Sequence, residues 1–229
     1  MLEQGVIVIG TESGVGKTCD ATALLLALRA RGIPAWPMKP VQTGAEDDRA
    51  PDLDAALAAA QLSADPTRYA LLAPCRFPLP ASPHLAARAA GAAIDPDRIR
   101  AALRSLRAED TPLVIEGAGG VLVPLTETLL QVDLLLEFAL PFVLVARPGL
   151  GTLNHTLLTL EALRHRAATV CGVVLSGINP AGDLIEQDNH ATLQRRNPAL
   201  PILPFPRLNP QDPDALRRAG AALLDGLKK

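Results

Sequence analysis

GVIVIGTESGVGKT, residues 5–18, is followed by an apolar helical periodicity over residues 21–28. An apolar strand, a glycine-rich loop and an amphipathic helix in this order are typical of a phosphate-binding loop. The glycines let successive backbone N–H groups face one anion, and the helix N-terminus adds partial positive charge. Lys17 can reach the outer phosphates and Thr18 can ligate Mg²⁺. The stretch therefore predicts a nucleoside triphosphate as the ligand.

The loop departs from the strict pattern at one position. That pattern has glycine six residues before the lysine, where this chain has Thr11, with Gly10 one step earlier. The alternative is a chance glycine turn between a strand and a helix. We favour a variant phosphate loop, because both flanks have the periodicity that the motif requires.

Length and composition predict one intracellular domain over residues 1–229, since 48% hydrophobic residues can fill a single core. The net charge of −2 gives no broad electrostatic reason to bind nucleic acid or an anionic membrane. The longest uncharged apolar run, residues 138–146, is too short to span a bilayer. Cys19, Cys75 and Cys171 are widely spaced without a CxxC pair, so we expect neither disulfides nor a zinc site, and a cytoplasmic location.

The use of lysine singles out two positions. Among 22 lysines and arginines only four are lysine, at residues 17, 39, 228 and 229. Lysine is a compact point charge, whereas arginine is a planar fork. Lys17 and Lys39 are therefore candidate functional residues, although a surface lysine after a strand is the alternative for Lys39.

Apolar strands alternate with amphipathic helices along the chain. This order predicts an α/β fold with a mainly parallel central sheet and helices on both faces, as in P-loop NTPases. The expected strands are 5–10, 34–38, 112–116, 141–146, 170–176 and 200–203, and the expected helices are 17–31, 52–62, 95–108, 152–167, 182–195 and 211–227.

Ligands of such sheets gather beyond the carboxyl ends of the strands. Polar or glycine-rich segments follow the first four expected strands, with residues 39–44, 116–120 and 147–152 after the second, third and fourth. We expect these four edges to converge on one site. Residues 74–83 contain four prolines and are predicted to form a stiff connector that packs over the edge of that site.

Two carboxylates are candidate Mg²⁺ ligands. Glu116 ends an apolar strand and precedes a glycine run, and Mg²⁺ prefers oxygen ligands of this kind. Asp52, at the start of an expected helix, is the second candidate, with a helix N-cap as the equally weighted alternative. Asp54 competes with Asp52 for this position.

The set GTESGVGKT, KPVQTG at 39–44, ASPH at 81–84, IEGAGG at 115–120, LGTLNH at 150–155 and LPFPRLNP at 203–210 resembles the dethiobiotin synthetase family. The resemblance covers residues 5–210 in order. It implies a homodimer of α/β subunits, with sites at the interface, that uses ATP and Mg²⁺ to join CO₂ to 7,8-diaminononanoate. One amine captures CO₂ as a carbamate, ATP phosphorylates the carbamate, and the second amine displaces phosphate and closes the ureido ring.

The match to the family's motifs also implies the residue roles. Lys39, Lys17 and Thr11 would be catalytic. The nucleotide would bind at Gly14, Val15, Gly16, Lys17, Thr18, Cys19, Asp52, Glu116, Gly117, Ala118, Gly119, Ser176, Pro204, Phe205, Pro206 and Gln211, the substrate at Thr43, Gly120, Gly151, Thr152, Leu153 and Asn154, and Mg²⁺ at Thr18, Asp52 and Glu116. The segment 151–154 would receive the substrate carboxylate across the dimer interface, and His155 is expected to cap or pack.

One departure concerns the base. The family often has asparagine after the fifth strand, where this chain has Ser176, and a hydroxyl cannot make a bidentate amide contact. The alternatives are that Asn179 replaces it from the loop or that residues 204–206 hold the base by packing, so we expect weak base discrimination. The competing classes are partition-type ATPase switches and amide-forming enzymes of cobyrinate metabolism. Glu12 stands where the switches have a signature lysine, and there is no room for the glutaminase domain of the latter.

Overall fold

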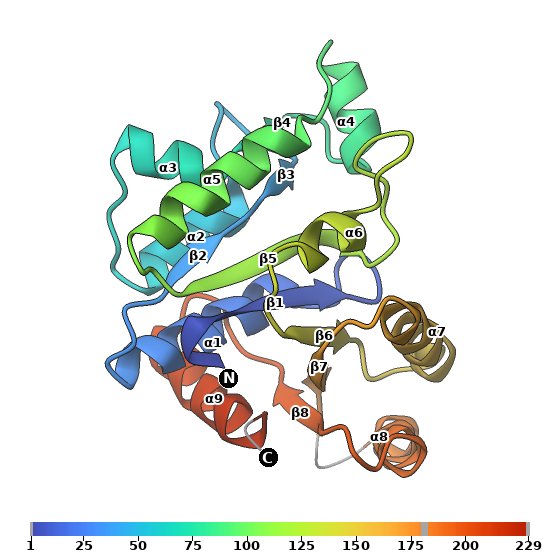
Figure 1. The fold of residues 1–229 in the computed structure, drawn as a ribbon. Helices are drawn as coiled ribbons and strands as arrows, with labels where there is room; N and C mark the ends of the chain where they lie inside the picture. Colours follow the sequence, from blue (N-terminus) through green and yellow to red (C-terminus); the bar gives the residue numbers. More distant parts are fainter. Residues whose placement is uncertain (1, 180–182, 228–229) are drawn as a thin grey trace.

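The central element of the computed structural model is a six-stranded sheet (Figure 1). The structure describes residues 2–179 and 183–227. Within this part the strand order is β2-β5-β1-β6-β7-β8, and each neighbouring pair is parallel. The strands are β1 Gly5–Gly10, β2 Trp36–Met38, β5 Leu113–Gly120, β6 Phe142–Ala146, β7 Val170–Ile178 and β8 Ile202–Pro206. The predicted α/β class with a mainly parallel sheet is confirmed.

Helices cover both faces of the sheet (Figure 1). In β1, Val6 and Val8 point into an apolar cluster with α1 and α9, whereas Ile7 and Ile9 point into a cluster with α5, α6, α7 and α8. This two-sided burial explains why the strand is a continuous apolar run rather than an alternating one. The helices are α1 Lys17–Ala30, α2 Pro51–Ala59, α5 Pro96–Ala108, α6 Gln131–Leu136, α7 Thr152–His165, α8 Leu184–Arg196 and α9 Pro213–Gly226.

A second, two-stranded parallel sheet was not expected from the sequence. It pairs β3 Val41–Thr43 with β4 Cys75–Phe77, and in the chain α3 Pro66–Leu72 precedes β4 and α4 Pro83–Ala89 follows it. The prediction of a plain connector at residues 74–83 is therefore wrong for its first part, which forms β4. The rest of the connector lies over the site, as expected.

Strand β5 is longer than predicted. It continues through the glycine run to Gly120, so Glu116 lies inside the strand, opposite Val8 of β1, rather than at its end. The first part of the glycine run is thereby held in the sheet. The backbone that borders the phosphate loop is thus a fixed strand and not a free loop.

Helices α1 and α9 lie against each other at backbone distance. A Cβ added to Gly220 of α9 would be 2.0 Å from the carbonyl oxygen of Ala23 in α1. Only glycine permits this approach, because any side chain would push the helices apart. The helix that carries the phosphate loop is therefore fixed by the helix at residues 213–226.

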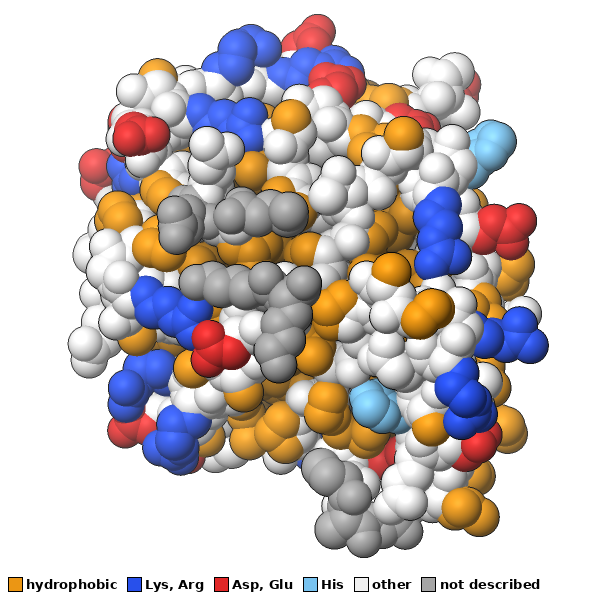
Figure 2. Space-filling model, turned by 60° about the horizontal axis from the view of Figure 1, so that its bottom comes forward, with side chains coloured by type: hydrophobic (Ala, Val, Ile, Leu, Met, Phe, Trp, Pro, Cys, Tyr) orange, Lys and Arg blue, Asp and Glu red, His pale blue; other side chains and the backbone are white. Residues whose placement is uncertain are grey.

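Charged side chains of both signs are interspersed with hydrophobic ones on the face drawn in Figure 2. Among the described residues, no helix combines the length and the apolar character needed to cross a membrane. Lys228 and Lys229, the other two lysines of the chain, lie outside the described residues.

Candidate functional site

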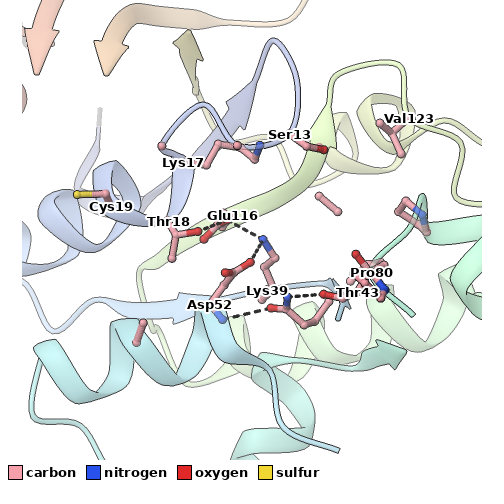
Figure 3. A pocket seen from close by; sticks show the side chains of 18 of the residues that line it. Ser13, Lys17, Thr18, Cys19, Lys39, Thr43, Asp52, Pro80, Glu116 and Val123 are labelled. Atoms are coloured by element: carbon pink, nitrogen blue, oxygen red, sulfur yellow. Dashed lines mark hydrogen bonds and ion pairs between the residues drawn. The ribbon is translucent and has the colours of Figure 1, made fainter. Parts of the chain in front are cut away.

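A pocket of about 850 Å³ lies beyond the carboxyl ends of β1, β2 and β5 (Figure 3). The phosphate loop forms one wall, and residues 80–83 form the opposite edge. Three of the four predicted edges meet here. The fourth, residues 147–152, does not line this pocket, which corrects the expectation that all four converge within one chain. It borders the phosphate loop instead, through an ion pair of 2.6 Å between Arg147 and Glu12.

The phosphate loop turns into α1 at Gly16, the N-cap, whose φ of 103° is in the left-handed region. A Cβ there would lie 2.3 Å from the hydroxyl oxygen of Ser176, so the loop also needs glycine for space. Lys17 is buried and its Nζ donates to the carbonyl oxygen of Glu12 at 2.8 Å. Burial and the nearby charge of Lys39 lower the pKa of Lys17 to about 8.

Lys39 is the centre of an ionic cluster (Figure 3). Its Nζ lies 2.6 Å from Oε1 of Glu116 and 2.7 Å from Oδ2 of Asp52. The hydroxyl of Thr18 donates to the same Oε1 at 2.9 Å. Lys39 is 4% exposed and Glu116 is 7% exposed, so these charges lie largely out of water. The carboxylates of Asp52 and Glu116, from two segments far apart in sequence, thus meet at the ammonium group of Lys39.

The cluster stabilises its own charged forms. Burial alone would lower the pKa of Lys39, but Glu116 and Asp52 outweigh it, and the pKa lies above its ordinary value. Burial would likewise raise the pKa of Asp52, and Lys39 holds it below its ordinary value. The lysine is therefore a cation, and Asp52 an anion, at neutral pH.

The oxygen donors of this cluster fit a Mg²⁺ ion. Thr18, Asp52 and Glu116 supply one hydroxyl and two carboxylates around the position of one ammonium group, and Mg²⁺ usually takes one or two carboxylates besides water and phosphate oxygens. Among the described residues there is no group of three or more His, Cys, Asp or Glu that could form a closed protein cage. These residues therefore suit a Mg²⁺ ion that is also bound by the phosphate oxygens of a nucleotide.

The structure also separates Asp52 from Asp54. Asp54 pairs with Arg49 at 2.6 Å and accepts from the Tyr69 hydroxyl at 2.9 Å, away from Lys39. The N-cap of α2 is Ala50, so Asp52 is the second helical residue and the N-cap alternative for it is wrong. Of the two, Asp52 faces the pocket.

Two glutamines missed in the sequence support the walls of the pocket. Buried Gln131 accepts from the N–H of Ala118 and donates to the carbonyl oxygens of Ala118 and Gly120, both at 3.0 Å. Gln42 donates to the carbonyl oxygen of Thr43 at 2.8 Å and accepts from the N–H of Asp52 at 3.4 Å. Neither contact has a local sequence signal, because each joins segments that are distant or irregular.

The segment expected at the substrate carboxylate lies at the N-terminus of α7. Gly151 is the N-cap with a φ of 92°. The Thr152 hydroxyl is buried against Thr156, so it is not directed to solvent, whereas backbone N–H groups of the first turn remain as donors. His155 neither caps nor packs in the core: its ring is partly exposed and Nδ1 lies 3.4 Å from Oε1 of Glu12. The expected capping role of His155 is thus not seen, and its ring packs against Glu12 at the surface.

The residues expected near the base of the nucleotide lie in different surroundings. The Ser176 hydroxyl donates to Oδ1 of Asp20 at 3.0 Å. Asp20 is 0% exposed, its Oδ2 has no hydrogen-bond partner among the described residues, and burial raises its pKa well above the ordinary value. Phe205 packs in the apolar cluster under α1 and α9, which corrects its expected contact with a ligand.

The remaining expected residues are placed as follows. Gly14, Gly16, Lys17, Thr18, Cys19, Thr43, Asp52, Glu116, Ala118 and Gly119 line the pocket, whereas Thr11 and Gly120 line a separate groove beside α7. Val15 and Gly117 are buried and do not line the pocket, and Pro204, Pro206 and Gln211 are exposed. Pro80 of the expected connector lines the pocket, and Val123, Pro210 and Leu216 line it without having been expected.

The chain is similar to known proteins over nearly its full length. A family model described as an AAA domain matches residues 4–211. The ATP-dependent dethiobiotin synthetase BioD of Anaeromyxobacter dehalogenans (strain 2CP-C) is 40% identical over 218 residues, 95% of each chain. The protein of the same name from Agrobacterium fabrum (strain C58 / ATCC 33970) is 42% identical over 217 residues, 94% of this chain and 92% of that one.

Solved structures show a likeness of fold alone. A ParA family ATPase from Chlorobium tepidum TLS has a TM-score of 0.57 at 14% identity, with 99% of this chain and 94% of that one covered. The MinC:MinD cell division protein complex of Aquifex aeolicus has a TM-score of 0.56 at 12% identity, with 97% and 88% covered.

Proposed function

The chain belongs to the family of ATP-dependent dethiobiotin synthetases, and from this premise we propose how its pocket joins CO₂ to 7,8-diaminononanoate. It is an ATP-dependent ligase of biotin biosynthesis. The observation that carries the residue roles is the buried cation of Lys39, which faces the same pocket as the phosphate loop.

The reaction needs positive charge at two places. A carbamate is an anion, and a transferring phosphoryl group spreads negative charge over its oxygens. Lys39 is the cation for the carbamate and Lys17, at the start of α1, is the cation for the outer phosphates. Because a buried cation is not screened by water, it stabilises developing charge more strongly than a surface lysine would.

The protein need not supply a covalent nucleophile, since each bond forms between the reactants themselves. Its task is to hold carbamate and phosphate in line and to exclude water. Thr18, Asp52 and Glu116 would hold Mg²⁺, whose chemistry is to neutralise phosphate charge. Thr43 and the strand held by Gln131 border the space left for the diamine.

We also propose that two copies of the chain complete the site. The N-terminus of α7, which suits a carboxylate, does not line the main pocket of its own chain. Beside it lies an apolar groove of about 480 Å³, with exposed Leu122 and Leu158 at its surface. A second copy on this groove would bury the leucines and bring its α7 toward the pocket. We further propose a cytoplasmic location, because the three free thiols suit a reducing compartment. We also propose that residues 1–229 form one domain.

A phosphate-release assay tests the function. Turnover is expected only with ATP, Mg²⁺, 7,8-diaminononanoate and bicarbonate together. Turnover without the diamine, or stimulated by a protein partner, would instead indicate an ATPase switch.

The role of Lys39 is tested by Lys39→Gln. We expect ring closure to be abolished while nucleotide binding, measured by calorimetry, stays largely intact, because Lys17 and the loop N–H groups remain. Undiminished formation of dethiobiotin by this variant would remove Lys39 from the mechanism.

A further inference from the structure

Lys39 occupies the place in which a divalent cation would neutralise Asp52 and Glu116. Its ammonium group is within hydrogen-bond distance of both carboxylates, at 2.7 and 2.6 Å. It shares Oε1 of Glu116 with the Thr18 hydroxyl. Of the three side chains assigned to the metal, Asp52 and Glu116 therefore pair directly with Lys39. The third, Thr18, is hydrogen-bonded to Glu116.

The charges around the cluster are balanced. Lys17 and Lys39 supply two ammonium groups, and Asp52 and Glu116 supply two carboxylates. A divalent cation added to both carboxylates would lie within a few ångströms of the Lys39 ammonium. The metal ion and the ammonium group would repel each other strongly, because little water lies in the site to screen their charges. The ammonium and the metal ion therefore compete for the same oxygen atoms.

We propose that Lys39 is the internal counter-ion of the metal site in the empty enzyme, and that a divalent cation displaces it from the two carboxylates toward the substrate. This inference rests on the proposed function, which assigns the carboxylates to Mg²⁺ and Lys39 to the carbamate. As long as Lys39 stays between both carboxylates, its charge is already neutralised. The exchange makes that charge available only when the metal is present.

The surroundings of Lys39 allow such a movement. Its Nζ lies 3.4 Å from the carbonyl oxygen of Gly117, on the strand that borders the space for the diamine. The pocket continues toward Thr43 and Pro80 (Figure 3). The four-carbon stem of lysine can turn its charged end by rotamer changes without a backbone shift.

The test compares Mn²⁺ binding without nucleotide, by electron paramagnetic resonance, in the wild type and in Lys39→Met. Removal of the competing ammonium is expected to tighten Mn²⁺ binding at least about tenfold. Mg²⁺ is also expected to raise the melting temperature of the variant more than that of the wild type, since it replaces a missing counter-ion. The matched control is Arg31→Met, which removes one positive charge from a peripheral ion pair with Asp225.

The outcomes separate the two hypotheses. Equal or weaker Mn²⁺ binding by Lys39→Met, with binding abolished by Glu116→Gln, would overturn the counter-ion role and leave the metal site in place. Tight binding that survives Glu116→Gln in the Lys39→Met background would overturn the metal assignment of the proposed function, and the inference with it. Tighter binding in Lys39→Met that Glu116→Gln removes supports both.

A second measurement avoids any folding defect of the variant. In a crystal structure of the wild type with Mg²⁺ and a non-hydrolysable ATP analogue, Lys39 is expected to be beyond hydrogen-bond distance of Asp52 and of Glu116. If both ion pairs persist beside a bound metal ion, the exchange does not take place.

Discussion

At the scale of single residues, Lys17 is a cation whose charge depends on pH. Burial and the charge of Lys39 lower its pKa to about 8, so it is charged below that pH and loses its proton above it. The affinity for ATP should therefore weaken as the pH rises through about 8, by up to about tenfold per pH unit. Calorimetry in the presence of a chelator, from neutral to alkaline pH, measures this without a metal ion.

The same profile in Lys39→Gln provides the check. Loss of the repulsion from Lys39 should raise the pKa of Lys17 and move the weakening to higher pH. A midpoint that stays in place in the variant would show that a different group controls the profile.

Ser176 determines a second prediction at this scale. Its hydroxyl proton is directed to Oδ1 of Asp20, so Ser176 can offer a base only an acceptor lone pair. A single such hydrogen bond contributes about 1 kcal/mol, so kcat/KM values for ATP, CTP and GTP should agree within about tenfold. Steady-state kinetics with the three nucleotides measure this, and exclusive use of ATP would contradict it.

At the scale of elements, Gln131 couples α6 to the end of β5. Gln131→Leu removes three hydrogen bonds from buried backbone groups of Ala118 and Gly120. We expect the free energy of unfolding to fall by about 2–4 kcal/mol, measured with urea, and KM for the diamine to rise. Gln131→Glu keeps the acceptor for the Ala118 N–H but turns a carboxylate oxygen toward two carbonyl oxygens, so it should destabilise at least as much as the Leu variant. A Leu variant as stable as the wild type would refute the role.

The long elements were predictable because they bury one face or both. The continuous apolar run of β1 indicates burial on both faces, and the apolar periodicity of α1 indicates burial of that helix. The three-residue strands β3 and β4 and the short helices α4 and α6 are too brief for any period to develop, so only tertiary contacts define them. The glycine run was expected to be a loop, and it is a strand because β1 and Gln131 hold it.

The candidate site was predictable where a backbone motif or a rare lysine marked it. Lys17, Thr18, Lys39 and Glu116 meet as expected. The link between Ser176 and Asp20 joins residues 156 positions apart, and nothing local in either segment indicates it. Phe205 was misplaced because an aromatic residue between two prolines gives no sign of which face it buries.

At the scale of the whole molecule, the proposed dimer makes a testable prediction. Leu158, 57% exposed on α7, borders the apolar groove, and Leu158→Glu would place a charge in the proposed interface. We expect monomers in sedimentation velocity and at least about a tenfold loss of ring closure, with an unchanged circular dichroism spectrum.

The matched control is Leu184→Glu on α8. Leu184 is 80% exposed and does not line the groove, so its replacement should leave both assembly and activity unchanged. If Leu158→Glu remains dimeric and active, the groove is not the interface.

The backbone contact between α1 and α9 at Gly220 also bears on biosynthesis. The phosphate loop and α1 are translated before α9, and almost two hundred residues separate the two helices in the chain. Until α9 is made, the face of α1 that packs on it is uncovered, so the nascent chain should attract chaperones that bind hydrophobic segments. Nucleotide protection against proteolysis should accordingly appear only in chains that extend through residue 226.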